Sequence, residues 1–379
     1  MDNNVALYIH IPFCKSKCLY CDFPSFCRME GSMLEYSKML SKEIEKSTMG
    51  MEISSIFIGG GTPTYLSLEG LKLIKDSVDK LKKAKDMEFT VEGNPGTFEI
   101  DKLKLLEAMG VNRLSMGLQA WQNDLLKKIG RIHSLEDFIS SYKMARELGF
   151  KNINVDLMFG LPDQNLLQWE ETLKNVIKLN PEHISCYSLI LEEGTPFMKM
   201  YEEDKITLVS EDEERDMYDE AINLLDKAGY NNYEISNFSK NGKECKHNMV
   251  YWSMKEYIGC GASAHSFFKG KRYSNEKDVL QYIKKIKEEG SAVNEIHVNT
   301  EKDNIEEFIF LGLRKMAGIS LIEFKQLYKR DIFKLYEDVI NKYIRLGLLA
   351  IDGEKMRLTP KGIPISNTVM SDFILDKLD

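Results

Sequence analysis

The first half of the chain alternates short apolar runs with longer amphipathic segments. The apolar runs predict strands at residues 7–11, 55–58, 88–92, 113–116, 152–157 and 183–189. The segments between them predict helices at 33–46, 68–82, 101–109, 135–148 and 167–179. In the third of these helices Leu103, Leu106 and Met109 recur at helical spacing, which indicates one apolar face.

Repeated strand–helix units predict a sheet of parallel strands with right-handed crossovers. Six units are fewer than the eight of a closed barrel, so we predict an α/β fold with an open, partial (β/α)6 TIM-like barrel. Polar and glycine-rich segments follow these strands, and the carboxyl ends of strands form the active face in such folds. These segments are 14–21, 59–63, 92–95, 117–119 and Asp156.

The second half of the chain has a different pattern. A helix with an acidic start is predicted at 211–228, and a glycine-rich stretch at 258–265 precedes another helix at 278–289. From residue 304 the pattern is three helices and a hairpin whose turn is Asp352-Gly353, which predicts an α+β winged-helix-like module. We therefore predict three parts, a barrel at 1–230, a connecting region at 231–300 and the terminal module at 301–379.

Composition narrows the functional classes. Hydrophobic residues make up 43% and charged residues 29% of the 379 residues, as in a soluble globular protein with a sizeable core. The net charge of −8 argues against nucleic-acid binding, and the terminal module balances 13 basic with 13 acidic residues. We read that module as structural or as a lid over a substrate. Without a signal peptide or a membrane-spanning segment, the expected location is the cytoplasm.

Three cysteines carry the strongest chemical signal in the chain. Cys14, Cys18 and Cys21 lie on one loop directly after the first predicted strand, in the spacing Cys-x3-Cys-x2-Cys. Three thiolates can hold a cubane iron–sulfur cluster and leave one iron open, whereas electron-transfer clusters usually close all four corners. The alternatives are a zinc site or a chance grouping. Zinc usually takes a second pair of ligands at matching spacing, and none follows here.

Four further motifs accompany the cysteine loop: Tyr8-Ile-His-Ile-Pro-Phe-Cys14, Gly59-Gly-Gly-Thr-Pro-Thr64, Asn154-Val-Asp-Leu-Met-Phe-Gly-Leu-Pro162 and Glu307-Phe-Ile-Phe-Leu-Gly-Leu-Arg314. Together they resemble the radical S-adenosylmethionine (SAM) superfamily over essentially the whole chain. More narrowly, the chain is similar to the branch that contains oxygen-independent coproporphyrinogen III oxidase and the HemW heme chaperones.

This resemblance implies a [4Fe-4S] cluster on Cys14, Cys18 and Cys21, with SAM bound to the open iron. The reduced cluster of such proteins cleaves SAM into methionine and a 5′-deoxyadenosyl radical. Glycines after the second strand suit a cofactor loop, because they let the backbone approach a ligand closely. The cofactor-contacting positions carried over are Tyr8, Tyr20, Gly60, Gly61, Thr62, Glu92, Gln119, Arg131 and Asp156.

The last three of these positions match a second SAM site in the oxidase and have ordinary alternatives. Gln119 could make a strand-end hydrogen bond, and Arg131 could form a surface ion pair. Asp156 lies in an apolar strand, where an unpaired buried carboxylate would be costly, which favours a role in the site.

Two departures separate the chain from the oxidase pattern. Phe23 stands where the oxidase has a fourth cysteine, and Cys14 lies so near the start that the oxidase's N-terminal extension is expected to be absent. Cys27, beyond the motif, is interpreted as an ordinary cysteine.

A third feature favours heme binding. His247-Asn-x-x-Tyr-Trp252 resembles the heme-binding motif of the chaperones, in which a histidine can ligate iron and aromatic rings can pack on the porphyrin. A structural role for His247 is the alternative. His265 and Cys245 are candidates for a second ligand.

The sequence therefore predicts a heme chaperone that binds a [4Fe-4S] cluster, SAM and heme. Following the resemblance, it passes heme to acceptor proteins such as membrane respiratory enzymes, with peripheral contact at the membrane during delivery and a homodimer left open. The main alternative is the oxidase, which decarboxylates the propionates of coproporphyrinogen III. Another radical enzyme, such as a methyltransferase, and a DNA-binding terminal module are weaker alternatives.

Overall fold

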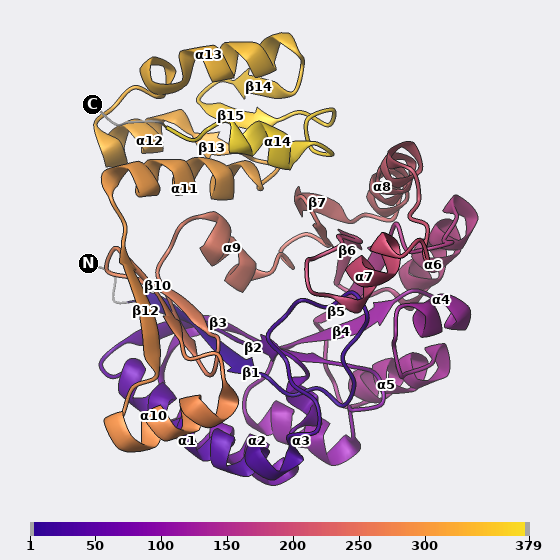
Figure 1. Cartoon of the computed structure of the whole chain (residues 1–379), viewed down its shortest axis with the longest axis vertical. Helices are drawn as coiled ribbons and strands as arrows, with labels where there is room; N and C mark the ends of the chain where they lie inside the picture. The colour runs from indigo at the N-terminus through magenta and orange to yellow at the C-terminus, as the bar shows by residue number, and fades with distance from the viewer. Residues whose placement is uncertain (1–3, 376–379) are drawn as a thin grey trace.

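A curved sheet of parallel strands forms the centre of the molecule (Figure 1). The computed structural model describes residues 4–375. Six strands pair in sequence order with every neighbour parallel, as the open (β/α)6 barrel predicts. They are β1 (Asn4–Ile11), β2 (Glu52–Gly60), β3 (Lys82–Gly93), β4 (Arg113–Gln119), β5 (Ile153–Phe159) and β6 (His183–Ser188). The α/β prediction is confirmed.

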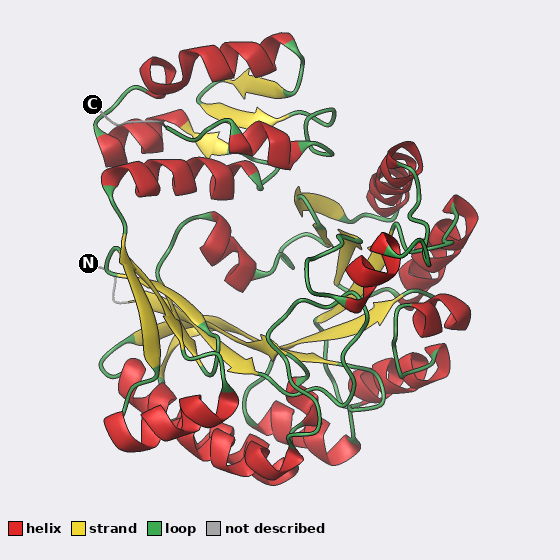
Figure 2. Ribbon diagram, in the orientation of Figure 1, coloured by secondary structure: helices red, strands yellow, loops and turns green. Residues whose placement is uncertain are grey.

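Helices cover the convex side of this sheet (Figure 2). They are α1 (Met33–Ser47), α2 (Leu68–Asp79), α3 (Ile100–Ala108), α4 (Asn123–Lys128), α5 (Leu135–Glu147), α6 (Leu166–Leu179) and α8 (Glu211–Lys227), with short 3-10 turns at Glu30–Ser32 and Pro63–Tyr65. Helix α7 (Pro196–Glu202) instead contacts the cysteine loop, where Phe197 N–H donates to the carbonyl oxygen of Leu19. The predicted second helix ran to residue 82, but α2 ends at Asp79 because Lys82 pairs with Glu52 as the first residue of β3.

Burial explains why the strands read as continuous apolar runs. Every residue of β4 is buried, since helices cover one face and the loops at the barrel opening cover the other. On the helix side Leu103 and Leu106 of α3 are fully buried, as their spacing predicted. Capping boxes fix the starts of the next helices, at Ser134 for α5, Asn165 for α6 and Ser210 for α8.

The segment after α8 extends both edges of the sheet. Within residues 4–375 the sheet has twelve strands, in the order β12-β11-β10-β9-β1-β2-β3-β4-β5-β6-β8-β7. The added strands are β7 (Asn231–Glu234), β8 (Asn237–Ser239), β9 (Tyr257–Cys260), β10 (His265–Phe268), β11 (Lys271–Asn275) and β12 (Val293–Val298). Residues 231–300 thus continue the barrel sheet, and also supply α9 (Lys246–Trp252) on its concave side and α10 (Val279–Glu289).

The terminal module lies across the opening of the curved sheet (Figure 1). It consists of α11 (Glu301–Leu313), β13 (Ile319–Ser320), α12 (Leu321–Tyr328), α13 (Ile332–Arg345), β14 (Leu349–Asp352), β15 (Lys355–Leu358) and α14 (Ser366–Ser371). The predicted hairpin is present, and Gly353 takes the left-handed conformation (φ +59°) that its turn requires. Helix α11 packs against α9. Over the described part of the chain, no helix combines the length and apolarity needed to cross a bilayer.

Candidate functional site

Two neighbouring cavities open on the concave side of the barrel. The first cavity has a volume of about 480 Å³ and contains the three motif cysteines, and the second has a volume of about 430 Å³. Phe23, Gly60 and Glu92 line both cavities, so the two spaces meet at a common wall. Volumes of this size are typical of sites for small molecules and cofactors.

The cysteine loop forms one side of the first cavity. The hydroxyl of Thr62 lies 3.5 Å from the sulfur of Cys14, and Arg131 Nη1 donates to the sulfur of Cys18 at 3.4 Å. Burial raises the pKa of Cys14 and Cys21, so loading of metal must release protons from these thiols. Within residues 4–375, no three Cys, His, Asp or Glu side chains converge closely enough to hold a single metal ion. The three thiols line one cavity, which has room for a group larger than a single ion.

The glycines at the end of β2 are required by the packing of the cysteine loop. A Cβ on Gly61 would lie 2.7 Å from the carbonyl oxygen of Phe13 and 3.0 Å from the sulfur of Cys14. Gly60 has φ +116°, and a Cβ there would lie 2.5 Å from the ring of His10. Both glycines also line the first cavity. Glycine here therefore lets the loop dock on the strand end and keeps backbone groups at the cavity wall.

Two half-buried carboxyl groups, Glu92 and Asp156, also line the first cavity. Burial, with a smaller effect from the charge of Asp156, raises the pKa of Glu92 to about 8, while Gly60 N–H donates to its Oε2 at 3.2 Å. Burial also raises the pKa of Asp156, which accepts hydrogen bonds from Ser115 Oγ at 3.0 Å and Asn154 Nδ2 at 2.8 Å. The positive charge of Arg113 offsets only part of the effect of burial on both groups, so a positively charged ligand would further stabilise their ionised forms.

Gln119 and Arg131 complete the first cavity. Gln119 ends β4 in a left-handed conformation (φ +73°), which is uncommon outside glycine and is often found at functional sites. Arg131 Nη2 donates to Asn94 Oδ1 at 2.9 Å and to the carbonyl oxygen of Gly117 at 2.5 Å. These contacts hold the guanidinium of Arg131 inside the first cavity. The alternative raised from the sequence was a surface ion pair. Asn94 was not predicted as a site residue, although it lies two residues after Glu92 in the predicted strand-end segment 92–95.

Of the three remaining predicted positions, two line a cavity and one does not. Tyr20 lines the first cavity, whereas Tyr8 lines the second. Thr62 lies outside both, in contact with Cys14 and with Asn94 Nδ2, which donates to its hydroxyl at 2.8 Å.

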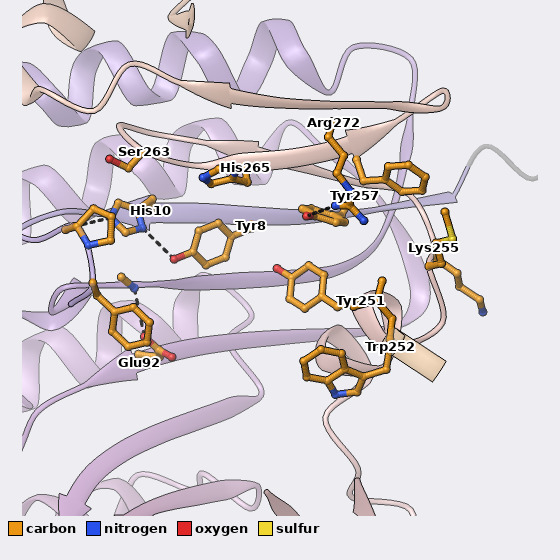
Figure 3. A pocket seen from close by; sticks show the side chains of 16 residues that line it. Tyr8, His10, Glu92, Tyr251, Trp252, Lys255, Tyr257, Ser263, His265 and Arg272 are labelled. Atoms are coloured by element: carbon orange, nitrogen blue, oxygen red, sulfur yellow. Dashed lines mark hydrogen bonds between the residues drawn. The ribbon is translucent and has the colours of Figure 1, made fainter. Parts of the chain in front are cut away.

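Several aromatic side chains line the second cavity (Figure 3). Its walls come from β1, the ends of β2 and β3, the segment after the cysteine loop, α9, β9, β10, β11 and one residue of α11. Besides the shared residues, its lining includes Tyr8, His10, Tyr251, Trp252, Lys255, Tyr257, Ser263, His265, Phe267, Arg272 and Leu311. The hydroxyl of Tyr8 lies 2.9 Å from His10 Nδ1, and His10 Nε2 donates to the carbonyl oxygen of Pro24 at 2.9 Å. The sequence did not predict this cavity as a unit, because its wall segments lie far apart along the chain.

His247 lies outside both cavities. Its side chain is 1% exposed, its Nδ1 lies 2.8 Å from Ser55 Oγ, and its Nε2 lies 2.7 Å from the hydroxyl of Tyr251. Burial and the charge of Arg113 lower its pKa to about 3, so the ring is neutral. Of its motif, Tyr251 and Trp252 reach the second cavity.

The two candidate second ligands are placed differently. Cys245 is buried against Glu88, with 3.4 Å between its sulfur and Oε1, whereas His265 lines the second cavity.

Comparison with known proteins agrees with this architecture. The family model for the radical SAM superfamily matches residues 8–176, and that for the HemN C-terminal domain matches residues 299–365. The solved structure titled "Coproporphyrinogen III oxidase (HemN) from Escherichia coli is a Radical SAM enzyme" superposes with a TM-score of 0.85 at 26% identity, covering 97% of this chain and 89% of the other. Fold and cysteine site together define a protein of the radical SAM class, which implies a [4Fe-4S] cluster and SAM.

Curated relatives narrow this class. The heme chaperone HemW of Bacillus subtilis is 41% identical over 97% of this chain and 99% of its own length. The heme chaperone HemW of Lactococcus lactis is 38% identical over 99% of this chain and 98% of its own length. The heme chaperone HemW of Escherichia coli is 40% identical over 69% of this chain and 69% of its own length. The chain belongs to the HemW family of radical SAM proteins, as the sequence motifs predicted.

Proposed function

We propose that this protein is a heme chaperone that holds a [4Fe-4S] cluster, binds SAM and passes heme to acceptor proteins. The observation that carries the proposal is the pair of adjoining cavities, one lined by three cysteines and the other by aromatic side chains. The relatives that share nearly the full length of the chain are named heme chaperones, which supports the same function.

The first cavity fits a cluster and SAM. Cys14, Cys18 and Cys21 would supply three thiolates, with Thr62 and Arg131 directing hydrogen-bond donors at two of the sulfurs. Such donors tune and orient metal-bound sulfur. When bound and reduced, the cluster supplies the electron that cleaves a carbon–sulfur bond of SAM.

The carboxyl wall of the same cavity suits the rest of SAM. Glu92 and Asp156 would attract its ammonium and sulfonium groups, and the backbone at Gly60 and Gly61 leaves room for the amino acid part. The protein's own task in this cavity is to orient the ligands and exclude water.

The acceptors in this proposal are membrane respiratory enzymes, approached from the cytoplasm at the membrane surface, and the chaperone itself can act as a monomer or a homodimer. These features follow from the family resemblance. A pull-down with heme-loaded protein and detergent-solubilised membranes, compared with heme-free protein, would test them.

The oxidase reaction is the second candidate function. It is favoured by the 0.85 TM-score with HemN over 97% of this chain. Against it, Phe23 occupies the position of the oxidase's fourth cysteine, and its side chain is 62% exposed between the two cavities.

One experiment separates the two functions. Reconstituted protein is incubated anaerobically with coproporphyrinogen III, SAM and a reductant, and the porphyrins are resolved by chromatography after oxidation, with an active oxidase as control. In parallel, hemin binding and transfer to an apo-hemoprotein are followed by absorbance. We expect hemin binding and transfer without protoporphyrin. Repeated turnover to protoporphyrin would make the protein an oxidase.

A further inference from the structure

The second cavity has the chemical character of a porphyrin site. Its walls are the flat side chains of Tyr251, Trp252, Tyr257 and Phe267, with Leu311 closing one side from α11. A porphyrin is a large, flat, mostly apolar ring, and aromatic side chains are the usual surface for packing such a ring. It also needs a nitrogen donor for iron and cations for its two propionates.

Three histidines lie near this cavity, and two of them already use both ring nitrogens. His10 bonds to Tyr8 and Pro24 through its two nitrogens and is 4% exposed. His247 bonds to Ser55 and Tyr251 and does not line the cavity. Iron coordination by either would first require breaking these buried contacts.

His265 is in a different position. Its side chain is exposed in the cavity, and no hydrogen bond joins it to any residue in the range 4–375. In Figure 3 it projects from its strand near Tyr8, with Ser263 on one side and Tyr257 on the other. An imidazole that is free at the start of β10 can coordinate iron without a cost in lost contacts.

The neighbours of His265 along the sheet match the rest of a heme. Two residues along a strand advance roughly 7 Å, so Phe267 lies on the same face as His265. Phe267 pairs with Arg272 across β11 and with Tyr257 across β9. Iron held at His265 would thus place part of the porphyrin over Phe267.

A cation is also available at the outer end of this cavity. Arg272 is engaged by Glu307, at 2.5 and 2.8 Å, and therefore offers little net charge. Lys255 lines the same cavity and forms no ion pair with any described residue. Of the Lys and Arg residues that line this cavity, it is therefore the one without a carboxylate partner among the described residues, and so the candidate for pairing with a propionate.

We propose that the second cavity is the heme site, with His265 as the axial ligand and Lys255 as a propionate partner. This inference rests on the proposed heme-chaperone function and refines it. His247 then acts as a positioning residue. Its Nε2 holds the hydroxyl of Tyr251 at 2.7 Å and so fixes an aromatic wall of the cavity.

Hemin titration of the full-length protein tests the assignment, with the Soret band and the electron paramagnetic resonance spectrum as readouts. His265→Ala should weaken hemin binding at least tenfold and change the Soret position, and added imidazole should restore the wild-type spectrum. Lys255→Gln should weaken binding a few-fold without a spectral change. His297→Ala is the matched control, since His297 lies on the exposed strand β12 outside both cavities.

His247→Ala supplies the contrasting outcome. Here we expect a lower melting temperature, but the wild-type Soret position in the folded, hemin-loaded protein. A wild-type spectrum and affinity in His265→Ala, or a spectral change in His247→Ala that imidazole reverses, would overturn the assignment of the ligand. Wild-type protein that does not bind hemin at all would instead overturn the chaperone function itself, and this inference with it.

Discussion

The two cavities are built in opposite ways. The first is formed mainly by polar groups in or after the strands β1 to β6, with Arg131 reaching in from the loop that follows α4. The second shares Phe23, Gly60 and Glu92 with the first, but most of its aromatic side chains come from segments more than two hundred residues after β1, which reach it because β9 pairs with β1. Ligand chemistry that needs charged and sulfur donors is thus encoded locally, whereas the apolar site depends on the edge of the sheet.

The largest expected effect comes from removing a cysteine of the first cavity. Replacing Cys14, Cys18 or Cys21 with alanine should abolish the brown chromophore and bound iron of the reconstituted protein, because two thiolates cannot hold a cubane cluster. Cys27→Ala is the matched control, since Cys27 is a free, half-buried cysteine just beyond the loop. Analysis of iron and sulfide content measures cluster loading in the motif variants and in the control. Full iron content in any of the three motif variants would contradict the cluster assignment.

A second prediction concerns the carboxyl wall. The pKa of Glu92 is raised to about 8, above its value in an unfolded chain, so the group favours the folded state when it is protonated. This contribution is complete below about pH 4.5 and is lost as the pH rises to about 8, by at most about 1.4 kcal/mol per pH unit. The cluster-free wild type should therefore lose more unfolding free energy over this pH range than Glu92→Gln does.

Denaturant midpoints of the two proteins at several pH values measure this difference. Glu69→Gln, an exposed residue of α2, should follow the wild type. Parallel pH profiles for the wild type and Glu92→Gln would show that the carboxyl of Glu92 is not raised in the folded protein.

These differences also explain what could be predicted from the sequence. The six parallel strands and the cysteine loop follow from apolar periodicity and short motifs, so both were predicted. The strands β7 to β12 were missed because they have only three to six residues each and many of these residues are polar, which leaves no clear apolar alternation. The position of His247 could not be predicted either, since its two partners, Ser55 and Tyr251, are identified only once α9 is known to pack on β2.

The third prediction tests how tightly the first cavity is packed. In Gly61→Ala the new methyl group would press on the backbone of Phe13 and on Cys14, and overpacking of this kind costs about 1–3 kcal/mol. We expect a folded protein with reduced cluster loading. Gly31→Ala is the control, because nothing lies within 4 Å of the Cβ that it would add. Circular dichroism checks the fold, and iron content checks the loading. Equal iron content in the two variants would show that the loop tolerates the extra atom.

The smallest expected effect is also the one that connects the two cavities. Phe23 lines both, and 62% of its side chain is exposed, so its removal should leave the fold intact. If its ring separates the two ligands, Phe23→Ala should weaken both SAM and hemin by a few-fold, since each loses part of one apolar wall. Leu311→Ala, confined to the second cavity, should affect hemin alone. Titrations with SAM and with hemin measure the affinity of each variant for each ligand. Unchanged SAM binding in Phe23→Ala would mean that the cavities work independently, because a wall that both ligands touch cannot be shortened without a cost to each.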